Sequence, residues 1–381
     1  MMQYTRFGAT GLEVSRFGLG CMRFPKDESQ TIEMVRYAVD HGVNYLDTAY
    51  VYRGSEDLLA KALKNGYRKK VNLVTKAPLW NIDEYAGFER YLDIQLKRLK
   101  TDYIDVYLLH NLYGPNWDRA KRYNGFAFLE EMKKKGKIGV GGLSIHATLD
   151  AYKEIIDAHA WEVIQIQLNI LDAKNEAGIE GLEYGAATGA AMVIMEPLRG
   201  GNLVTCMPRT VAALLETYPE KRSIVEWAFR WLYDRSEIAV VLSGTTNLKQ
   251  LKDNLRIFKN AQSGCMSEAD QELIAQIRTE YEAQTVIGCT TCDYCMPCPQ
   301  NVAIPTIFRF YNNLKNLNGT DKLLYSDAFV SQGRSADRCV ECGACEKKCP
   351  QRLPIIELLK TAHGELLLPR DVVVNLARDK A

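Results

Sequence analysis

Tyr103-Ile-Asp-Val-Tyr-Leu-Leu-His110 is a short apolar stretch that ends in a polar residue, and stretches of this kind recur along the first 280 residues. Each is followed by a longer segment in which apolar residues recur at helical spacing, as Leu92, Leu96 and Leu99 do. Alternating short strands and amphipathic helices are typical of repeated βα units on a parallel sheet. Eight strands are predicted: Ser15–Gly20, Tyr45–Thr48, Val71–Lys76, Tyr103–His110, Lys137–Ser144, Val163–Leu168, Ala191–Glu196 and Ile238–Ser243.

The number and spacing of these units indicate the fold class. Eight strand–helix units over roughly 250 residues match an α/β fold, the (β/α)8 TIM barrel, which we predict for residues 1–280. A doubly wound sheet is the alternative, but Gly18-Leu-Gly20-Cys-Met22 lacks the third glycine of a dinucleotide-binding fingerprint. Ser55, followed by two acidic residues, predicts the capped start of the helix after the second strand. Catalytic residues are expected at the carboxyl ends of the strands.

The 11 cysteines are unevenly distributed, and eight of them form two runs between residues 289 and 349. In a reducing cytosol such a cluster is expected to hold metal rather than disulfides. The second run, with its Cys349-Pro350 ending, fits the bacterial ferredoxin spacing, in which the fourth cysteine ligates the other cluster of a pair. The predicted ligands are Cys289, Cys292, Cys295 and Cys349 for one 4Fe-4S cluster, and Cys298, Cys339, Cys342 and Cys345 for the other. The fourth ligand of each cluster is the open part of this assignment.

Structural zinc is the alternative for Cys-x-x-Cys pairs, but zinc requires neither a triple spacing nor Cys-Pro endings. The first run is one residue shorter than the usual spacing before Cys298, which leaves room for an altered turn or a different ligand. Helices are predicted by Ile307, Phe308, Tyr311 and Leu314 between the runs and by Ile355, Leu358 and Leu359 after the second. We therefore predict an α-helical ferredoxin-like iron–sulfur domain over residues 281–381.

Four polar residues stand at or just after predicted strand ends: Asp47, Tyr52, Lys76 and His110. A tyrosine is a weak proton donor near neutral pH because its reference pKa is about 10, and a nearby ammonium lowers that pKa. Lys76 would supply the ammonium, Asp47 would pair with it, and His110 would hydrogen-bond a substrate carbonyl oxygen. The alternative is a structural ion pair at the end of the barrel, with His110 as an ordinary loop residue.

Asp47-Thr-Ala-Tyr-Val-Tyr52, Val74-Thr-Lys76 and Leu108-Leu-His110 resemble the signature of the aldo-keto reductase family. The resemblance runs in order from Gln3-Tyr4 to Leu251–Asn254, and the cysteine runs make it similar to the branch of that family with a C-terminal ferredoxin-type domain. It implies that Tyr52 is the general acid of a tetrad, that the substrate is a small carbonyl or related organic molecule, and that NADP or NAD lies across the barrel mouth.

The resemblance also assigns nucleotide contacts. It puts Ser144 and Gln165 near the nicotinamide carboxamide. Ile145 stands where the family has an asparagine after the serine, and His146 follows it. Met195 stands where a family tyrosine often stacks on the nicotinamide, and a methionine covers a ring with less defined geometry.

Gln250 replaces an arginine that is common in NADPH-preferring members, and Lys249 would compensate in part, so the choice between NADPH and NADH stays open. The other expected contacts are Gly20, Cys21 and Met22 after the first strand, Pro197, Leu198, Arg199 and Gly200 along the pyrophosphate, and Ser243, Gly244, Thr245, Asp253 and Asn254 at the adenosine phosphate.

Hydride transfer moves two electrons, whereas each cluster carries one at a time, so coupling the domains needs an intermediate such as a flavin or a substrate radical. FMN at the barrel mouth is kept as a minority alternative because no motif identifies it. We expect electron exchange with a ferredoxin-like or other redox partner. Two other functions stay open: an electron-transfer protein whose barrel only binds NAD(P)H or a flavin, and a conventional reductase with structural clusters.

The amino-acid composition also bears on whether nucleic acid or a membrane is an expected binding partner. The 48 Lys and Arg residues nearly balance 47 Asp and Glu residues, which gives no electrostatic reason to bind nucleic acid or an anionic membrane. The N-terminus lacks the apolar run of a signal peptide, and no stretch is long and apolar enough for membrane insertion, so a cytoplasmic location is expected. Residues 111–125, rich in Tyr, Trp and Arg, are expected to form a loop that lines the substrate.

Overall fold

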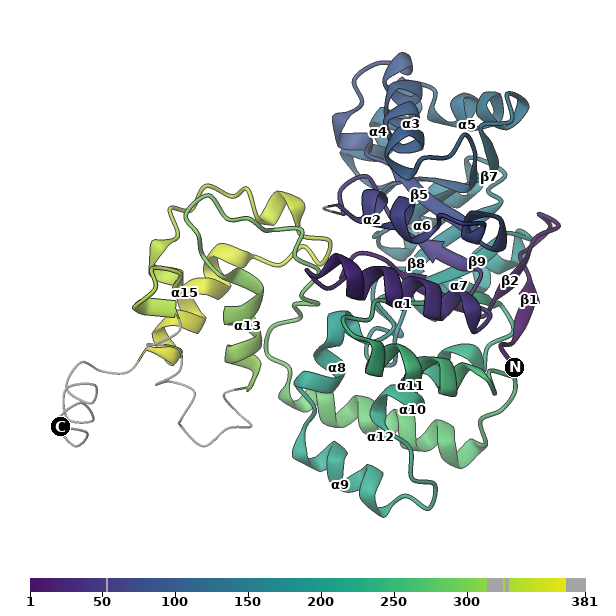
Figure 1. The fold of residues 1–381 in the computed structure, drawn as a ribbon. Helices are drawn as coiled ribbons and strands as arrows, with labels where there is room; N and C mark the ends of the chain where they lie inside the picture. Colours follow the sequence, from purple (N-terminus) through teal and green to yellow (C-terminus); the bar gives the residue numbers. More distant parts are fainter. Residues whose placement is uncertain (53, 314–324, 326–328, 368–381) are drawn as a thin grey trace. The chain divides into compact units, whose positions relative to one another are not determined.

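The apolar runs of the sequence form a closed barrel of eight parallel strands (Figure 1). Each strand pairs with the next one along the chain, and the circle closes where the last strand pairs with the first. This confirms the predicted barrel, with strand ends shifted by at most two residues. The strands are β3 (Phe17–Gly20), β4 (Tyr45–Asp47), β5 (Asn72–Ala77), β6 (Ile104–Leu109), β7 (Ile138–Ile145), β8 (Val163–Gln167), β9 (Ala191–Met195) and β10 (Ile238–Ser243).

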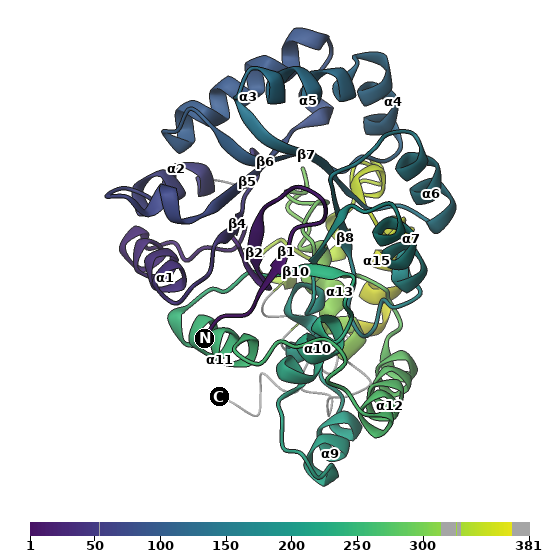
Figure 2. The same ribbon diagram turned by 90° about the vertical axis from the view of Figure 1, so that its right-hand side faces the viewer.

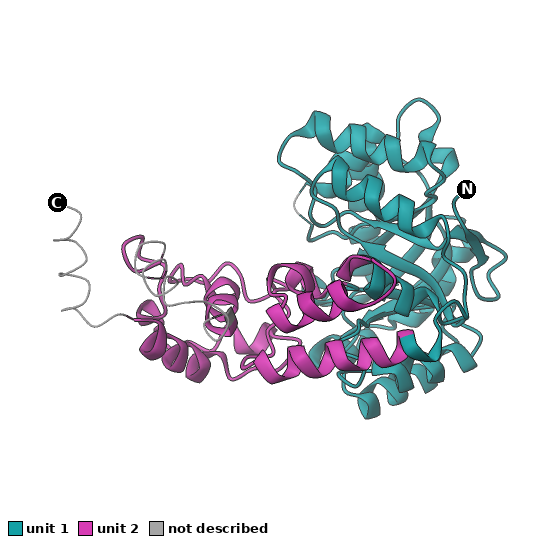
Figure 3. Cartoon of the chain, turned by 90° about the horizontal axis from the view of Figure 1, so that it is seen from below, with its two compact units in different colours: residues 1–197, 226–269 teal, residues 198–225, 270–381 magenta. Residues whose placement is uncertain are grey.

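The computed structural model describes residues 1–52, 54–313, 325 and 329–367. Their contacts divide them into two units, residues 1–197 with 226–269 and residues 198–225 with those from 270 onward (Figure 3). The segment after β9 is thus grouped with the C-terminal part of the chain. The domain boundary predicted after residue 280 stays a prediction. Of the described helices, none is long and apolar enough to cross a lipid bilayer.

An antiparallel hairpin precedes the barrel and was not predicted. It consists of β1 (Tyr4–Arg6) and β2 (Glu13–Ser15), so Ser15 belongs to the hairpin rather than to the first barrel strand. Phe7 and Val14 are buried in one apolar cluster with residues of the barrel interior. Figure 2 shows the hairpin lying across one end of the barrel. It covers the end of the barrel at which the strands begin, because Gly8 approaches the backbone of Ala191, where β9 begins.

Valine is the most frequent residue in the apolar cluster of the barrel interior, and at some positions the packing leaves no room for a side chain. A Cβ on Gly142 of β7 would lie 2.4 Å from the carbonyl oxygen of Val163 on β8, so the two strands approach closely there. The interior apolar cluster comprises Phe7, Val14, Tyr45, Val74, Val106, Leu108, Val140, Val163, Ala191, Val193, Ala239, Val240 and Leu242.

Helices cover the outside of the barrel (Figure 2). In α3, Leu92, Leu96 and Leu99 are buried as their spacing predicts, and the helix ends where Lys100 adopts a left-handed φ of 51°. The helices of this unit are α1 (Glu28–Asp40), α2 (Ser55–Ala62), α3 (Tyr85–Leu99), α4 (Pro115–Arg122), α5 (Gly125–Lys134), α6 (Leu149–Asp157), α7 (Gly178–Ala187), α10 (Ile224–Tyr233), whose first two residues are grouped with the other unit, and α11 (Leu248–Phe258).

Two local predictions were wrong. Residues 111–125 are not a continuous loop, because Pro115 starts the two-turn helix α4 and Trp117 of that helix is buried. Ser55 does not cap α2 from outside; Gly54 holds the cap position, and the Ser55 hydroxyl donates instead to the carbonyl oxygen of Cys21 at 2.8 Å. The serine therefore ties the helix start to the end of β3.

The second unit is helical and contains the cysteine runs. Its core packs Ile304, Ile307 and Phe308 of one helix against Ile355 and Leu359 of another, as the apolar spacing predicted. Leu314, also part of that prediction, lies outside the described residues. The predicted α-helical character of this part is confirmed. Its described helices include α8 (Asn202–Thr205), α9 (Arg209–Thr217), α12 (Glu268–Gln284), whose first two residues are grouped with the barrel, α13 (Ile304–Asn313) and α15 (Ile355–Leu366).

Candidate functional site

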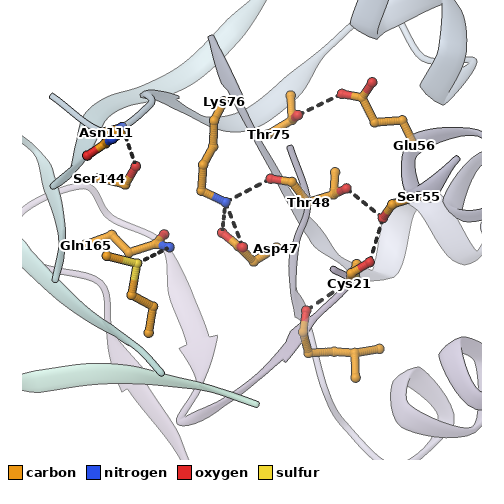
Figure 4. A network of polar contacts seen from close by, with 12 residues as sticks. Cys21, Asp47, Thr48, Ser55, Glu56, Thr75, Lys76, Asn111, Ser144 and Gln165 are labelled. Carbon is orange, nitrogen blue, oxygen red and sulfur yellow. Dashed lines mark hydrogen bonds and ion pairs between the residues drawn. The ribbon is translucent and has the colours of Figure 1, made fainter. Parts of the chain in front are cut away.

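Lys76 lies buried at the end of β5 and is held by three hydrogen bonds (Figure 4). Its Nζ donates to both carboxylate oxygens of Asp47 at 2.7 Å and to the carbonyl oxygen of Thr48 at 2.8 Å. The ion pair is almost fully shielded from solvent, with exposed side-chain fractions of 1% for Lys76 and 4% for Asp47. Burial raises the pKa of Asp47 while Lys76 opposes that rise, so the carboxylate depends on its ammonium partner.

Tyr52 and His110 flank this ion pair. The Nζ of Lys76 is 5.4 Å from the centre of the Tyr52 ring, and the Tyr52 and His110 rings meet edge to face at 6.3 Å. Burial, Lys76 and His146 lower the pKa of His110 well below its usual range, which keeps the imidazole neutral. Among the described residues, the buried Nδ1 of His110 has no hydrogen-bond partner. The structure thus brings the four predicted tetrad residues together at one end of the barrel.

Trp80 belongs to the same site and was missed from the sequence. It lies in the 3-10 turn η2 (Leu79–Asn81) directly after β5, and its ring centre is 5.2 Å from that of His110. Trp80 is 37% exposed, so part of this residue is accessible to solvent. Trp80 could have been predicted from the sequence, because it follows a barrel strand as closely as Tyr52 does.

A buried polar network ties Lys76 to the helix that follows Tyr52. Glu56, in the first turn of α2, accepts hydrogen bonds from Thr75 Oγ1 and Gln95 Nε2, both at 2.8 Å. Gln95 also donates to the carbonyl oxygen of Lys76 at 3.1 Å, and Arg98 pairs with Glu56 at 3.2 Å. Removing one member would leave buried polar groups unsatisfied, so this network fixes α2 against β5.

The predicted nicotinamide contacts end neighbouring strands. The Ser144 hydroxyl accepts a hydrogen bond from the Asn111 backbone N–H at 3.1 Å, and Gln165 Nε2 donates to the sulfur of Met195 at 3.7 Å (Figure 4). The carboxamide oxygen of Gln165 is buried and has no partner among the described residues. A nicotinamide carboxamide carries the N–H donors that such an oxygen requires, so these residues fit the nucleotide that the sequence indicates.

His146 takes part in a charged cluster that the sequence did not reveal. Its Nδ1 lies 3.1 and 3.2 Å from the two carboxylate oxygens of Glu176. Burial lowers the pKa of His146, but Glu176 and Glu196 outweigh burial and leave it raised. Nearby, Gln167 and Asn169 donate to the Asp172 carboxylate at 3.1 and 2.8 Å.

Glu196 is the carboxyl of this cluster with the most displaced pKa. Burial is the main cause that raises the pKa of Glu196 to about 7; His146 opposes this rise and Glu176 adds to it. Both glutamates adopt left-handed backbone conformations, with φ of 53° in each case. Such conformations are uncommon for residues with a Cβ and are retained where the surroundings require them. The mouth therefore holds a carboxyl that titrates near neutral pH.

Glu196→Gln is expected to change the pH dependence of stability. A carboxyl with a raised folded-state pKa holds its proton more tightly when folded, so its contribution is present below pH 4.5 and is lost as pH rises to about 7. The neutral variant should match the parent near pH 4 and exceed its unfolding free energy by roughly 3 kcal/mol near pH 8. Urea unfolding followed by tryptophan fluorescence measures this difference. Glu180→Gln, at an exposed glutamate paired with Lys153, is the control, and an equal difference at both pH values for Glu196→Gln would contradict the prediction.

The predicted adenosine-phosphate residues lie at the start of α11. Asn254 Nδ2 donates to Ser243 Oγ at 3.1 Å, and Asn247 caps the helix by accepting from the Gln250 N–H at 3.0 Å. Gln250 in turn accepts from the backbone N–H of Thr246 at 2.9 Å, so its carboxamide oxygen is engaged within the loop. A helix N-terminus offers backbone donors and a positive dipole end to a phosphate.

The other residues predicted to contact the adenosine phosphate differ in their exposure and in the partners of their side chains. Lys249 is exposed beside the helix start, whereas Asp253 pairs with Arg256 at 3.0 Å. The hydroxyl of Thr245 is buried and has no partner among the described residues.

Among the nucleotide contacts predicted at the end of β3, Cys21 has a structural role. The Cys21 N–H donates to the carbonyl oxygen of Asp47 at 2.8 Å, and burial raises the pKa of the Cys21 thiol well above its usual value. The thiol is therefore protonated and packs as a small apolar group. Gly20 lies close to Gly244, since a Cβ on Gly20 would be 3.3 Å from the Gly244 nitrogen, while Met22 is 41% exposed.

The predicted pyrophosphate segment is divided between the two units. Pro197 ends the first stretch of the barrel unit, whereas Leu198, Arg199 and Gly200 belong to the second unit. Arg199 and Gly200 form a 3-10 turn, η3 (Arg199–Gly201), with φ values of 49° and 65°. These three residues are therefore grouped with the cysteine runs.

Two hollows in the second unit are lined by cysteines from both runs. Cys289, Cys292 and Cys295 of the first run share one hollow with Cys349 of the second. The other hollow is lined by Cys295, Cys298, Cys339, Cys342 and Cys345. Thiolates from two separate runs around one space are what a cubane cluster requires, so the residues present fit two 4Fe-4S clusters. The crossed ligand sets remain a proposal.

Cysteines that line the same hollow also raise one another's pKa. Burial, with smaller contributions from Cys289 and Cys349, raises the pKa of Cys295 to about 12. Burial likewise raises the pKa of Cys345, with a smaller contribution from Cys339. Metal binding therefore has to displace protons from these thiols, which couples cluster assembly to proton release. Within the described residues, no three His, Cys, Asp or Glu side chains form a group that could hold a single metal ion.

Comparisons with known proteins match both parts of the chain. Residues 16–264 match the sequence model described as the aldo/keto reductase family, and residues 288–353 match that of a 4Fe-4S dicluster domain. The second match favours iron–sulfur clusters over the zinc alternative. Aldo-keto reductase YhdN of Bacillus subtilis (strain 168) is 33% identical over 298 residues, which cover 66% of this chain and 87% of that protein.

Two further relatives agree. The uncharacterized oxidoreductase YqkF of Bacillus subtilis (strain 168) is 26% identical over 284 residues, covering 67% of this chain and 90% of that protein. Among solved structures, the aldo-keto reductase AKR11C1 from Bacillus halodurans, in its holo form, has 26% identity and a TM-score of 0.61. That match covers 73% of this chain and 96% of the solved chain.

Proposed function

Since this chain belongs to the aldo/keto reductase family and carries a 4Fe-4S dicluster domain, we propose that it is an NAD(P)H-dependent oxidoreductase that couples hydride chemistry on a carbonyl or related organic substrate to iron–sulfur electron transfer. The observation that carries this proposal is the buried Lys76–Asp47 pair beside the Tyr52 ring and the neutral His110. A structural ion pair alone would not account for a neutral imidazole with an unpartnered nitrogen among the described residues.

The side chains of the mouth have distinct roles in carbonyl reduction. The Lys76 ammonium favours the phenolate of Tyr52, so the Tyr52 hydroxyl gives its proton to the carbonyl oxygen as negative charge develops there. His110, being neutral, orients the same oxygen by a hydrogen bond, and Asp47 keeps Lys76 in place. The nicotinamide, when bound, supplies the hydride. Gln165 and Ser144 would hold its carboxamide.

The clusters, when bound, carry electrons one at a time. The two cysteine-lined hollows would hold them, with Cys289, Cys292, Cys295 and Cys349 around one and Cys298, Cys339, Cys342 and Cys345 around the other. We propose that a ferredoxin-like redox partner exchanges electrons with this domain. The engaged oxygen of Gln250 and the exposed Lys249 are compatible with either NADPH or NADH.

An anaerobic titration of iron-replete protein with NADH and with NADPH tests the coupling. We expect one nucleotide to bleach the visible cluster absorbance to the extent that dithionite does. Gln165→Leu, which removes the unpartnered carboxamide oxygen, should lose this bleaching while dithionite still bleaches the clusters. Full bleaching by dithionite with none by either nucleotide would overturn the coupling and favour structural clusters or electrons supplied from elsewhere. Flavin absorbance after cluster removal would identify FMN as the electron-splitting group.

A further inference from the structure

Cys342 differs from the other cysteines of the two runs in its exposure. It is exposed, whereas the other seven are partly buried. It lines the second of the two hollows, together with Cys298, Cys339 and Cys345. A cluster bound in this hollow would have one of its thiolate ligands at the protein surface. Because electron transfer between proteins slows steeply as their redox centres move apart, the second hollow is well placed for exchange with a partner.

The surface around Cys342 combines an apolar residue with two cations. Val340 lines the second hollow and is 61% exposed. Lys348 lines the same hollow, and it is exposed together with Lys347 in the 3-10 turn η6 (Glu346–Lys348). We call Val340, Cys342, Lys347 and Lys348 the docking face. Its members lie next to one another because three of them line one hollow and the fourth is the chain neighbour of Lys348.

The two lysines of the docking face are not neutralised by their surroundings. Neither Lys347 nor Lys348 has an ion-pair partner among the described residues. The acidic side chains nearest to them in the second run have other partners: Glu341 pairs with Lys360 at 2.7 Å, and the Glu346 carboxylate accepts a backbone N–H of α15 at 2.9 Å. An acidic protein surface is therefore complementary to this face.

The hollow at Cys289 has a different lining. Apart from its cysteines, its only charged lining residue is Asp293, and its side chains of Ile304, Phe308 and Ile355 are buried. No lysine or arginine lines it. The exposed cysteine and the cations thus belong to the second hollow alone. Cys295 lines both hollows, which gives a connection between a cluster in one and a cluster in the other.

We propose that the docking face binds a small acidic iron–sulfur protein and that electrons cross there one at a time. In each crossing a cluster in the second hollow loses or gains one electron, and the cluster of the partner undergoes the opposite change. Opposite charges speed the encounter of the two proteins, and contact with the partner removes the apolar surface of Val340 from water. This inference rests on the proposed function, because it identifies the surface that the redox partner contacts and the charge of that partner.

Anaerobic stopped-flow mixing with an acidic 2Fe-2S ferredoxin tests the inference on the full-length, iron-replete protein, in the direction that the measured potentials favour. The double variant Lys347→Glu, Lys348→Glu should react about tenfold more slowly than the parent at low salt, since electrostatic steering contributes at least this much to such rates. In about 1 M KCl, where the Debye length is about 3 Å, the two proteins should react within about twofold of each other. Lys347→Glu alone, at a residue that does not line the hollow, should react about threefold more slowly at low salt and keeps the test readable if the double variant binds less iron.

The control for this test is Lys134→Glu, which makes the same charge change at an exposed lysine of α5 that has no ion-pair partner among the described residues. It should react as the parent does. An unchanged ferredoxin rate in Lys347→Glu and in the double variant, with full iron content, would overturn the inference. An equal fall in Lys134→Glu would overturn it as well, by showing a general charge effect.

An uncharged quinone separates failure of this inference from failure of the proposed function. A small neutral acceptor needs no docking face, so the reduced parent and all variants should pass electrons to it at equal rates. Exchange with the quinone but not with the ferredoxin would overturn the docking proposal and leave the proposed function intact. Clusters that exchange electrons with neither would overturn both.

Discussion

Tyr52→Phe is expected to lower kcat for carbonyl reduction by about 10²- to 10⁴-fold, which is the usual contribution of a positioned general acid. The variant keeps the ring that lies 5.4 Å from Lys76 and meets His110 edge to face, so only the proton donor is lost. Nucleotide binding and iron content should match the parent. Steady-state turnover of a panel of small aldehydes and ketones, with nucleotide binding measured by fluorescence, gives the comparison.

The control for this prediction is Tyr50→Phe. The Tyr50 ring packs edge to face on Tyr91 and lies under Arg98, and these ring contacts are kept in the variant, so removal of the hydroxyl should leave kcat within about twofold. Full turnover by Tyr52→Phe would rule out the tetrad mechanism. Lost carbonyl reduction together with retained electron flow from nucleotide to an artificial acceptor would reveal a second activity of the barrel. If electron flow is the only activity of both proteins, the electron-transfer alternative holds.

Cys298→Ser and Cys349→Ser are each expected to lose one whole cluster, and not the same one. The hollows are lined by cysteines of both runs, so Cys298→Ser should empty the site of Cys339, Cys342 and Cys345. Cys349→Ser should empty the site that holds Cys289. Each variant should therefore retain about half of the bound iron, because a cubane that lacks one of its four protein ligands is poorly held. Iron and sulfide analysis with EPR of the reduced proteins measures both effects.

The remaining EPR signal decides between crossed and uncrossed ligand sets. Cys265→Ser, which changes a cysteine of the barrel unit outside both runs, should retain all iron. A Cys298→Ser protein whose surviving cluster is sensitive to changes at Cys339, but not at Cys289, would show that the sets are uncrossed. Retention of all iron in both variants would mean that neither residue is a ligand.

The barrel could be predicted because each of its strands carries its own signal. Runs such as residues 238–242 of β10 are apolar throughout, as is typical of strands buried on both faces, and the helices between the strands show one apolar face. The hairpin β1–β2 could not be predicted in this way, because strands of three residues are too short to show a period. Helix α4 was not predicted because its polar composition resembles that of a loop.

The tetrad could be predicted because a closed parallel barrel brings all strand ends to one face. Asp47, Lys76 and His110 therefore share a site although they are distant in sequence. Glu176 could not be found by this rule. It lies nine residues beyond the end of β8, and its pairing with His146 depends on how the intervening chain folds back. The grouping of residues 198–225 with the cysteine runs is likewise set by tertiary packing alone.

The mixing of the two cysteine runs in each hollow has a consequence for biogenesis. All eight barrel strands are complete once Ser243 has been synthesised, whereas neither hollow has its full lining until residues near the C-terminal end of the second run have left the ribosome. Domains fold as units during synthesis, N-terminal ones first. Clusters can therefore be bound only after all eight barrel strands have been synthesised, and truncated chains that end between the two runs would contain every barrel strand but lack cysteines of both hollows.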